Sequence, residues 1–550
     1  MNVAEMLVES LLAEGVEYVF GIPGEENLEL IEALAASPIR FITTRHEQGA
    51  AFMADVYGRL TGRAGVCLST LGPGATNLIT GVADANSDGA PLVAITGQVS
   101  SERMHITGHQ YLDLAKLFEP ITKRTKLVMR PDSITEIVRL AFKYAQQEGK
   151  MGATHIDLPV DVAKMEVPQG IRPMLPQHRK PEYADLETIA QAAKILARAA
   201  SPVMLVGADA ARAGITREIM ALAHGAKIPV VNTMMAKGVI PSDDPYALGT
   251  IGIPQRDYQD LLLDRADVLL CVGYDIVELS PARLDTRLDK QIIHVSTGAA
   301  HVNRCYPPAI EVVGDMAETL RHLSQLTVRI QEPEYAFALR QAMLQEYAAC
   351  SADEGYPVKP QRILGDVRKV MGAGDILLSD VGAHKMWIAR HYLCDEPNTC
   401  LISNGFATMG IAVPGALAAK LLHPDKRVLA VTGDGGFMMN CQELETAVRE
   451  QLPFVTLIFN DSAYGLIQWK QNDRYGHANM TAFTNPDFVA LAESMGCKGY
   501  RVERTEDLLP TLQEAFRQSV PAVIDCPVDY GENVLLTKRL KELTEKWGEA

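Results

Sequence analysis

Short runs of β-branched and other apolar residues recur along the whole chain, and each is followed by glycine or a polar turn and then by a helical pattern of apolar positions. This alternation predicts strands joined by helices, and therefore parallel sheets covered on both faces. The predicted strands are residues 18–20, 41–43, 66–70 and 92–96 in the first third, 203–207, 229–233, 268–273 and 292–296 in the middle third, and 376–382, 428–436 and 454–461 in the last third. We expect an α/β fold of three doubly wound parallel-sheet domains.

Two breaks in this pattern predict the domain boundaries. The first is the proline-rich, aperiodic stretch PQGIRPMLPQHRKP, which is typical of a surface linker and ends at Pro181. The second is ACSADEGYPVKP, which separates two helical patterns and ends at Pro360. We place the boundaries near residues 175 and 355. The predicted domains are residues 1–172, 185–345 and 356–550, the last with a carboxyl-terminal tail.

Composition narrows the class of protein. The 550 residues are 47% hydrophobic and 22% charged, with a net charge of −16 and no long basic run. The sequence therefore lacks the basic segment that binding to nucleic acid or to an anionic membrane would need. No apolar run approaches the ~18 residues that a membrane span needs. The amino-terminal helical pattern contains three glutamates, unlike a signal peptide, and the nine scattered cysteines include no CxxC pair. We expect a soluble cytoplasmic protein with reduced cysteines.

The most informative segment is RVLAVTGDGGFMMNCQELETAVREQLPFVTLIFNDSAYG, residues 427–465. It predicts one βαβ unit in which Asp434 and Asn460 emerge at the carboxyl ends of two parallel strands, the edge where α/β sheets bind ligands. Three glycines beside Asp434 allow the backbone to approach a phosphate. These are Gly433, Gly435 and Gly436. Carboxylate and amide oxygens suit Mg²⁺, so the segment predicts a metal-bridged diphosphate.

Other interpretations of this segment are weaker. A lone GDG turn is most often structural, but the strand context and the spacing to Asn460 favour the metal site. The sequence contains neither GxGxxG, the dinucleotide-binding motif, nor GxxxxGK[ST], the P-loop motif. Neither of these two nucleotide-binding sites is therefore indicated.

The spacing from GDG to Asn460 resembles the thiamine diphosphate signature, and the first domain supplies matching segments. These are TTRHEQGAAFMADVYGRLTG and STLGPGATNLITGVADANSDGAPLVAITGQV. The chain resembles the acetolactate (acetohydroxyacid) synthases over nearly its whole length, most closely at residues 15–125 and 375–470. The resemblance implies a pyrimidine-binding domain, a central domain and a diphosphate-binding domain, with thiamine diphosphate and Mg²⁺ as cofactors.

The resemblance gives Glu47 the catalytic role of hydrogen-bonding N1′ of the cofactor's aminopyrimidine, where a carboxyl promotes the proton transfer that activates the thiazolium. The alternative is a helix-start glutamate favoured by the helix dipole. Asn77, at the end of GPGATN, is expected to bind the cofactor as well.

Further cofactor contacts follow from the family pattern. Met409 resembles the apolar residue that holds the cofactor in a bent conformation, and Ala407 would offer its carbonyl to the 4′-amino group. Ala383 and His384 resemble the loop that contacts the diphosphate. Ser462 would give its backbone carbonyl to Mg²⁺, beside Asp434 and Asn460. Leu466 is also expected to contact the cofactor.

Two residues bear on the substrate. Decarboxylases of the wider superfamily tend to have adjacent histidines where this chain has His109 followed by Gln110. The difference favours carboligation, with Gln110 positioning the substrate or an intermediate; a solvated loop amide is the alternative. Trp469 occupies the position of a tryptophan that shapes the acceptor pocket in biosynthetic family members. An isolated methionine such as Met409 is otherwise a core residue.

The middle domain argues against flavin. The segment GYDIVELSP at 273–281 stands where the biosynthetic enzymes carry an arginine-containing FAD contact, and VGADAARAG at 206–214 stands where a GGG turn is expected. The chain thus resembles the flavin-independent catabolic type, and we expect no FAD.

The expected activity is decarboxylation of one pyruvate and ligation of the hydroxyethyl enamine to a second pyruvate, giving 2-acetolactate and CO₂. Alternatives are another thiamine diphosphate-dependent decarboxylase or carboligase acting on other 2-oxoacids, a flavin-containing biosynthetic acetohydroxyacid synthase, or a non-catalytic paralogue. The resemblance also implies a homodimer or homotetramer with active sites between subunits. The charge and the length of the apolar runs predict no nucleic-acid or membrane partner.

Overall fold

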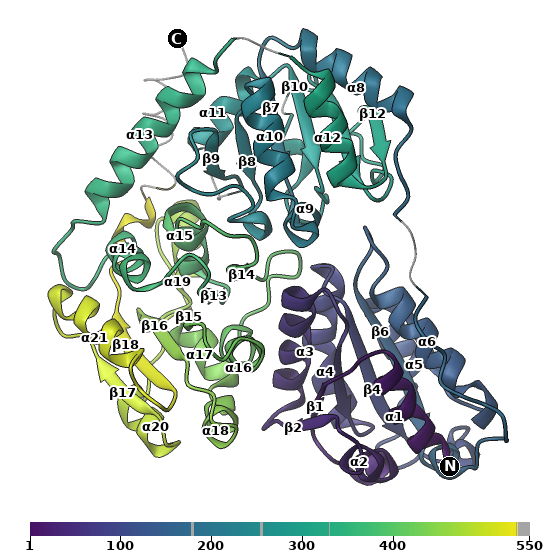
Figure 1. Cartoon of the computed structure of the whole chain (residues 1–550). Coiled ribbons are helices and arrows are strands. Elements are labelled where there is room, and N and C mark those ends of the chain that lie inside the picture. Colours follow the sequence, from purple (N-terminus) through teal and green to yellow (C-terminus); the bar gives the residue numbers. More distant parts are fainter. Residues whose placement is uncertain (178–180, 253–256, 286, 329–330, 535, 537–550) are drawn as a thin grey trace. The chain divides into compact units, whose positions relative to one another are not determined.

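The computed structural model describes residues 1–177, 181–252, 257–285, 287–328, 331–534 and 536. Within them the backbone forms three parallel six-stranded sheets with flanking helices (Figure 1). The α/β fold predicted from the alternating pattern is therefore confirmed. The predicted carboxyl-terminal tail at 537–550 and residues 178–180 of the predicted linker lie outside the described residues.

Contacts divide the chain into two compact units. The first unit comprises Met1–Arg179, Gly405–Pro424 and Met439–Pro453, and the second unit comprises the remaining described residues. The first unit holds one sheet and the second unit holds two. Two short segments of the last third of the chain thus fold with the first sheet, while the domain limits drawn from the sequence stay a prediction.

The first sheet has strand order β2-β1-β3-β4-β6-β5 and only parallel pairings. Its strands are β1 (Tyr18–Gly21), β2 (Arg40–Thr43), β3 (Gly65–Ser69), β4 (Leu92–Gln98), β5 (Arg124–Leu127) and β6 (Ala153–Pro159). The central strands β3 and β4 are buried throughout because their sequences GVCLS and LVAITGQ have apolar or small residues on both faces.

Helices cover both faces of this sheet. One face shares a hydrophobic cluster with α1 (Val3–Ala13), α2 (Leu28–Ala35), α6 (Ile134–Ala145) and α7 (Val160–Lys164). The other face carries α3 (Glu47–Thr61) and α4 (Pro73–Ser87) (Figure 1), and α5 (Leu114–Phe118) lies beside β5 and β6. Helix α16 (Ala412–Leu422) packs along α3, and α18 (Glu443–Arg449) contacts α16.

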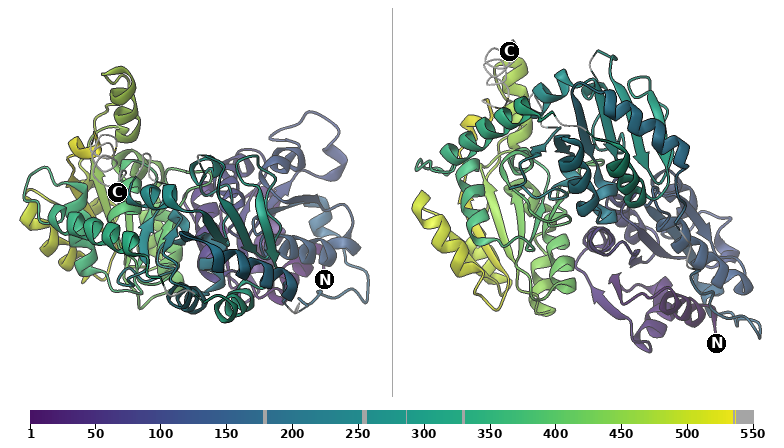
Figure 2. Two further views of the ribbon diagram at one scale, coloured as in Figure 1. Left: turned by 90° about the horizontal axis from the view of Figure 1, so that it is seen from above. Right: turned by 45° about the horizontal axis from the view of Figure 1, so that its top comes forward.

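The second sheet has strand order β12-β11-β10-β7-β8-β9. Its strands are β7 (Pro202–Val206), β8 (Val230–Asn232), β9 (Ala247–Thr250), β10 (Val268–Val272), β11 (Gln291–Ser296) and β12 (Pro308–Val313). One face packs against α8 (Leu186–Arg198), α9 (Ala208–Ala213), α10 (Thr216–Ala226) and α12 (Met316–Leu326), and the other against α11 (Tyr258–Arg265) and α13 (Glu334–Cys350). Figure 2 shows this part of the chain, in blue-green and teal, from two further directions.

The third sheet has strand order β14-β13-β15-β16-β18-β17. Its strands are β13 (Ile376–Ser379), β14 (Cys400–Ile402), β15 (Val428–Gly433), β16 (Val455–Asn460), β17 (Lys498–Arg501) and β18 (Ala522–Pro527). One face shares a cluster with α14 (Pro360–Val370), α15 (Ala383–His391), α19 (Gly465–Tyr475) and α21 (Leu508–Ala515). Helix α17 (Asp434–Asn440) follows β15, and α20 (Phe488–Ser494) lies beside β17 and β18.

The first and third sheets have the same topology. In each, the second strand along the chain lies at the edge beside the first strand, and the third strand lies on the opposite side of the first. The winding therefore reverses between β1 and β3, between β13 and β15, and, in the second sheet, between β7 and β10. Loops at the carboxyl ends of strands that flank such a reversal form the usual ligand crevice of an open α/β sheet. We therefore compare the predicted site residues with the loops at these three reversals.

All eleven predicted strands are present, and their ends lie within three residues of the predicted limits. Seven observed strands had not been predicted. These are β5, β6, β9, β12, β14, β17 and β18.

Candidate functional site

Glu47 is the first residue of α3, and its side chain is only 8% exposed. His46 caps the helix, because its Nδ1 accepts a hydrogen bond from the Gln48 N–H (3.1 Å). Asn77, one turn into α4, donates from Nδ2 to Glu47 Oε2 (2.9 Å). The structure thus brings together two residues that the sequence analysis had placed at the cofactor separately.

The GPG turn, residues 72–74, begins α4 and borders this carboxylate. A Cβ on Gly74 would lie 3.2 Å from Glu47 Oε1, and a Cβ on Gly72 would lie 2.8 Å from the carbonyl oxygen of Gln110. Gly72 also has a φ of +57°, a conformation that favours glycine. Gln110 and His109 are exposed on the loop that meets this turn. Glycine at these positions therefore lets Glu47 and the Gln110 loop each approach the GPG turn closely.

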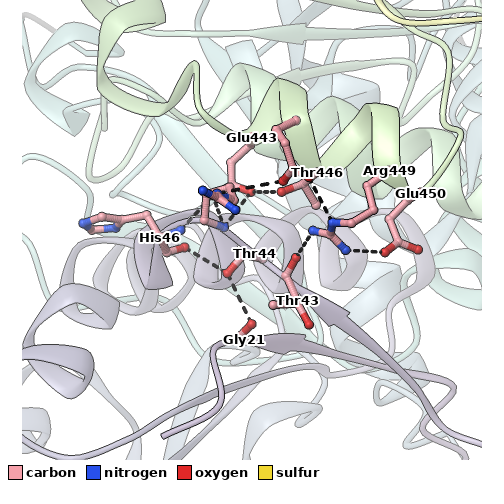
Figure 3. Close-up of polar contacts among 10 residues, drawn as sticks. Gly21, Thr43, Thr44, His46, Glu443, Thr446, Arg449 and Glu450 are labelled. Atoms are coloured by element: carbon pink, nitrogen blue, oxygen red, sulfur yellow. Dashed lines mark hydrogen bonds and ion pairs between the residues drawn. The ribbon is translucent and has the colours of Figure 1, made fainter. Parts of the chain in front are cut away.

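A buried carboxylate from α18 holds the chain immediately before Glu47 (Figure 3). Glu443 accepts hydrogen bonds from the backbone N–H groups of Arg45 (3.1 Å) and His46 (3.0 Å) and from the Thr446 hydroxyl (2.7 Å). The Glu443 side chain is fully buried, and burial raises its pKa to about 7. A Cβ on Gly49 would lie 2.6 Å from Glu443 Oε1, so glycine in the first turn of α3 makes room for the carboxylate.

The loop with Ala407 and Met409 is fixed to α4. The Thr408 hydroxyl donates to Asp84 Oδ1 (2.6 Å), and the Gly405 N–H donates to Asp88 Oδ1 (2.5 Å). These two bonds hold the loop at Gly405 and Thr408, against the C-cap residue of α4 and against α4 itself, the helix that also carries Asn77. Ala407 and Met409 therefore share one compact unit with Glu47 and Asn77.

The same aspartates take part in a buried ion cluster centred on Arg59. The Arg59 guanidinium lies 2.6 Å from Asp55, 2.8 Å from Asp84 and 2.9 Å from Asp88. Three carboxylates around one cation leave a surplus of negative charge, and burial together with Asp88 and Asp55 raises the pKa of Asp84. The cluster locks α3 to α4 behind the Glu47–Asn77 pair.

The second unit contains the predicted diphosphate and metal residues. Ala383 and His384 begin α15, directly after β13, and Asp434 follows β15, so they flank the reversal in the third sheet. His384 is 2% exposed, and burial lowers its pKa to about 3, so its ring is neutral at pH 7. Among the described residues, its Nε2 has no hydrogen-bond partner. A Cβ on Gly433 would lie 3.4 Å from this ring.

The GDGG turn is crowded around Asp434. A Cβ on Gly436 would lie 2.8 Å from Asp380 Oδ2, and a Cβ on Gly435 would lie 2.9 Å from the Tyr464 ring. Asp434 is 1% exposed, and burial raises its pKa. The turn thus requires glycine for packing, and it places a buried carboxylate at the carboxyl end of β15.

Asn460 and Ser462 lie beside this carboxylate. Ser462 donates its N–H to Asp434 Oδ2 (2.7 Å), while its carbonyl accepts from the Phe483 N–H (3.0 Å). Asn460 donates from Nδ2 to Asp525 Oδ1 (2.8 Å), which turns its Oδ1 away from Asp525. The expected adjacency of Asp434 and Asn460 on neighbouring parallel strands is present, since β15 pairs with β16.

Leu466 and Trp469 lie on α19. Trp469 is 7% exposed and belongs to the hydrophobic cluster of the third sheet, and Leu466 is partly buried against the same cluster. The indole is therefore a packed side chain in this structure. Its expected role at an acceptor pocket stays a prediction.

Three predicted site residues have strained backbones. Gln110, Ala407 and Ser462 have φ angles of +57°, +58° and +53°, and the described residues include eight non-glycine residues of this kind in all. A non-glycine residue with positive φ costs of order 1–3 kcal/mol and is found preferentially at functional sites. The strain supports assigning these three loops to a site.

Sequence reasoning missed Glu443, Asp525 and Asn485. Asn485, on the loop after α19, donates from Nδ2 to Asp434 Oδ2 (2.8 Å) and to Asn460 Oδ1 (3.0 Å). No motif or spacing identifies these three residues, because their partners are distant in sequence. Asp461 could have been noted beside Asn460; burial and Asp434 raise its pKa to about 7.

Two features that the described residues lack bear on the predictions. Within the described ranges, no group of three or more His, Cys, Asp or Glu side chains could hold a metal ion. A metal at Asp434 would therefore need amide, carbonyl or phosphate oxygens as well. No helix in the described part of the chain is both long and apolar enough to cross a bilayer.

Comparison with protein families gives three matches that together cover most of the chain. Residues 1–117 match the thiamine pyrophosphate enzyme N-terminal TPP binding domain, residues 189–323 match the central domain, and residues 380–526 match the C-terminal TPP binding domain. Glu47 and Asn77 fall in the first match, and Asp434 and Asn460 fall in the last.

Curated relatives match over almost their entire length. An acetolactate synthase of Bacillus subtilis is 36% identical, with 99% of this chain and 96% of the relative covered. A catabolic acetolactate synthase of Raoultella terrigena is 35% identical, with 98% and 97% covered. A probable acetolactate synthase large subunit of Methanocaldococcus jannaschii is 36% identical, with 97% and 93% covered.

Proposed function

This chain belongs to the acetolactate synthases, a family of thiamine pyrophosphate (thiamine diphosphate) enzymes, and on that premise we propose which reaction it catalyses and with which residues. The chain decarboxylates one pyruvate and joins the remaining two-carbon unit to a second pyruvate, giving 2-acetolactate and CO₂. Thiamine diphosphate supplies a thiazolium that accepts the electrons released with CO₂.

We assign the proton-transfer role to Glu47. Its carboxyl group holds and returns the proton at N1′ of the aminopyrimidine, a general acid–base role that requires a fixed carboxyl. The support is geometric: the side chain is buried at the start of α3, Asn77 binds one oxygen, and Glu443 and His46 fix the backbone on its amino-terminal side. Ala407 and Met409, held on α4 through Thr408, are the proposed contacts to the aminopyrimidine and the bend of the cofactor.

The donor set beside β15 fits Mg²⁺ and a diphosphate. The oxygens of Asp434 and Asn460 both point at one amide nitrogen, that of Asn485, and convergent hard oxygens are what Mg²⁺ prefers. Asp525 fixes which way the Asn460 amide faces. We therefore propose Asp434, Asn460 and the Ser462 carbonyl as the metal ligands.

The diphosphate itself would be held at the reversal of the third sheet. His384 offers a buried Nε2 for which the described residues provide no partner, and Gly433 and Gly436 leave no Cβ against the ring or against Asp380. Ala383, Gly435 and Leu466 complete the proposed cofactor contacts. A neutral imidazole suits this position, since a buried charge there would be costly.

We propose that Gln110 positions the substrate and that Trp469 limits the acceptor. Gln110 lies on an exposed loop in contact with the GPG turn, and the turn also borders Glu47. Trp469 would act through the packing of α19, because its indole lies in the core cluster.

We also propose that the enzyme works without FAD. In the second sheet the loops after β7 and β10 flank the reversal, where a dinucleotide would be expected. There the carboxylate of Glu278 accepts hydrogen bonds from the Ala208 N–H (3.0 Å), the Asp275 N–H (3.1 Å) and the Thr233 hydroxyl (2.5 Å). A protein carboxylate thus takes the backbone donors at the start of α9 that a dinucleotide phosphate would need.

The active enzyme is proposed to be a homodimer or homotetramer, in which Glu47 of one subunit serves the cofactor held by Asp434 of another. A cytoplasmic location is proposed as well. It is supported by the nine cysteines, all of which are free in the structure, as expected in a reducing compartment.

The proposal rests on two residue pairs in a chain of this family. Glu47 and Asn77 form the proposed aminopyrimidine contact, and Asp434 and Asn460 form the proposed metal site. The test incubates the purified protein with pyruvate, thiamine diphosphate and Mg²⁺ and quantifies acetolactate and acetaldehyde. Acetolactate should dominate, should require both cofactors, and should form with a colourless protein. Acetaldehyde as the main product would identify a decarboxylase, and a yellow protein with bound FAD would overturn the flavin-free assignment alone.

A further inference from the structure

The Asn485 amide lies where three side-chain oxygens meet. Its Nδ2 is 2.8 Å from Asp434 Oδ2, 3.0 Å from Asn460 Oδ1 and 3.4 Å from Ser462 Oγ. Two of these oxygens belong to the proposed metal ligands. One amide nitrogen thus donates toward a carboxylate, an amide and a hydroxyl oxygen. A small cation would bind at the same place, because the lone pairs of these oxygens converge there and attract an N–H donor and a cation alike.

The loop that carries Asn485 is hydrogen-bonded to the segment 462–464, which follows Asn460 and includes the proposed ligand Ser462. The Phe483 N–H donates to the Ser462 carbonyl (3.0 Å), and the Tyr464 N–H donates to the Thr481 carbonyl (2.9 Å). A bridge between Ala463 and Ala482 lies between these bonds. Asn485 is therefore held at a fixed distance from Ser462 by backbone pairing, and the contact does not depend on side-chain packing alone.

A carboxamide can serve two states of such a site. With Nδ2 inward it donates to the partly buried oxygens of Asp434 and Asn460 and satisfies them in the absence of a cation. Half a turn of the amide brings Oδ1 inward and offers an oxygen to a cation or to a water on it. Aspartate at this position could do only the second, and alanine could do neither.

We propose that Asn485 is a further residue of the metal site, which holds Asp434 and Asn460 in place before the cation binds and presents its own oxygen once the cation has bound. The inference rests on the proposed function, since it assumes a divalent cation at Asp434 and Asn460. It adds a third side chain, from a separate loop, to the two that the spacing of the sequence predicts.

The experiment compares Asn485→Ala and Asn485→Asp with the wild type, using the full chain freed of metal and cofactor. The control is Asn472→Ala, an exposed asparagine on α19. Two quantities are measured without any assay of activity: the melting temperature of the metal-free protein, and the affinity for Mn²⁺ as a spectroscopic probe, with and without thiamine diphosphate.

Both Asn485 variants should lower the metal-free melting temperature, by roughly 5 °C, because each loses the amide donor to the partly buried oxygens of Asp434 and Asn460. Asn485→Ala should also bind Mn²⁺ about tenfold more weakly, in the range typical for residues that support metal ligands. Asn485→Asp should bind Mn²⁺ at least as tightly as the wild type, because it keeps an oxygen and adds a charge. Asn472→Ala should change neither quantity.

Equal weakening of Mn²⁺ binding in both Asn485 variants would overturn the oxygen role, because only the donor would then matter. Unchanged melting temperatures and affinities in both would overturn the proposal altogether. Failure of the wild type itself to bind Mn²⁺ with thiamine diphosphate, or to form acetolactate, would instead refute the proposed function. The two failures are therefore distinguishable.

Discussion

Glu443 offers a sharp test of how this fold positions a catalytic carboxyl from a distance. Its carboxylate accepts from the backbone N–H groups of Arg45 and His46, which immediately precede Glu47 on the chain. Replacing Glu443 with Ala removes the acceptor for both N–H groups, while Glu443→Gln keeps one oxygen that both can reach. Because burial raises the pKa of Glu443 to about 7, glutamine resembles the protonated form that is present near neutral pH.

The size of the effect follows from the lost partners. A buried donor left without an acceptor costs about 1–3 kcal/mol, and the lower end applies to these two partly buried N–H groups, so Glu443→Ala should cost about 2 kcal/mol. Glu443→Gln should cost about 1 kcal/mol, the scale of one altered neutral hydrogen bond. If the start of α3 then shifts by about 1 Å, Glu47 is misplaced and turnover should fall by about 10²-fold in the alanine variant.

The assay is amide hydrogen exchange of the peptide covering residues 45–50, together with urea unfolding and turnover of pyruvate. Glu443→Ala should lose exchange protection in this peptide, stability and turnover, whereas Glu443→Gln should retain most of all three. Thiamine diphosphate and Mg²⁺ affinity should change less than turnover, since the proposed metal ligands lie elsewhere. Unchanged protection at 45–50 together with normal turnover in Glu443→Ala would refute the positioning role.

Three further predictions concern the separate parts of the site. Glu47→Gln should leave cofactor binding largely intact and slow exchange of the cofactor's C2 proton by about 10²–10⁴-fold, measured by proton NMR; near-normal exchange would contradict the assignment. Asp434→Ala should weaken Mg²⁺ and thiamine diphosphate together in calorimetric titrations, with partial rescue by excess Mg²⁺, and a cofactor affinity independent of metal would make the GDGG turn structural only. Glu278→Gln should remove a pH dependence: burial raises the pKa of Glu278 from its ordinary 4.5 to about 7, so its contribution is fully present below about pH 4.5 and is lost as the pH rises through 7. Wild type should therefore lose about 3 kcal/mol relative to Glu278→Gln between those limits in urea unfolding, and parallel stability curves would contradict this.

The strands that the sequence predicted differ physically from those it did not. The predicted strands are mostly central, and their apolar runs reflect burial on both faces. Five of the seven missed strands, β5, β9, β12, β14 and β17, lie at sheet edges. Edge strands such as RTKL and KGYR carry exposed charges and have no continuous apolar run. An exposed edge needs less hydrophobic sequence, so the pattern that marks a central strand is absent there.

The remaining two missed strands are instructive because they are central. β6 and β18 occupy the same place in the repeated topology, and each has an aspartate in the middle of its apolar run, Asp157 and Asp525. Each aspartate is buried and hydrogen-bonded, Asp157 by Thr96 and Asp525 by Asn460. A buried carboxylate interrupts the apolar run by which a central strand is predicted, and its hydrogen-bond partner is identified only in the folded sheet.

The same reasoning separates the parts of the site that the sequence could predict from the parts it could not. Asp434 and Asn460 were predictable because consecutive parallel strands carry their carboxyl ends to one edge, so spacing along the chain becomes distance in space. Glu443 and Asn485 reach their partners through contacts that no local pattern encodes: one binds backbone N–H groups 397 and 398 residues away, and the other binds side chains on a separate loop. Their targets are backbone donors and shared oxygens, which almost any sequence could provide. Residues that hold a site in place therefore leave a weaker trace in sequence than residues that contact its ligand, and only the folded structure identifies them.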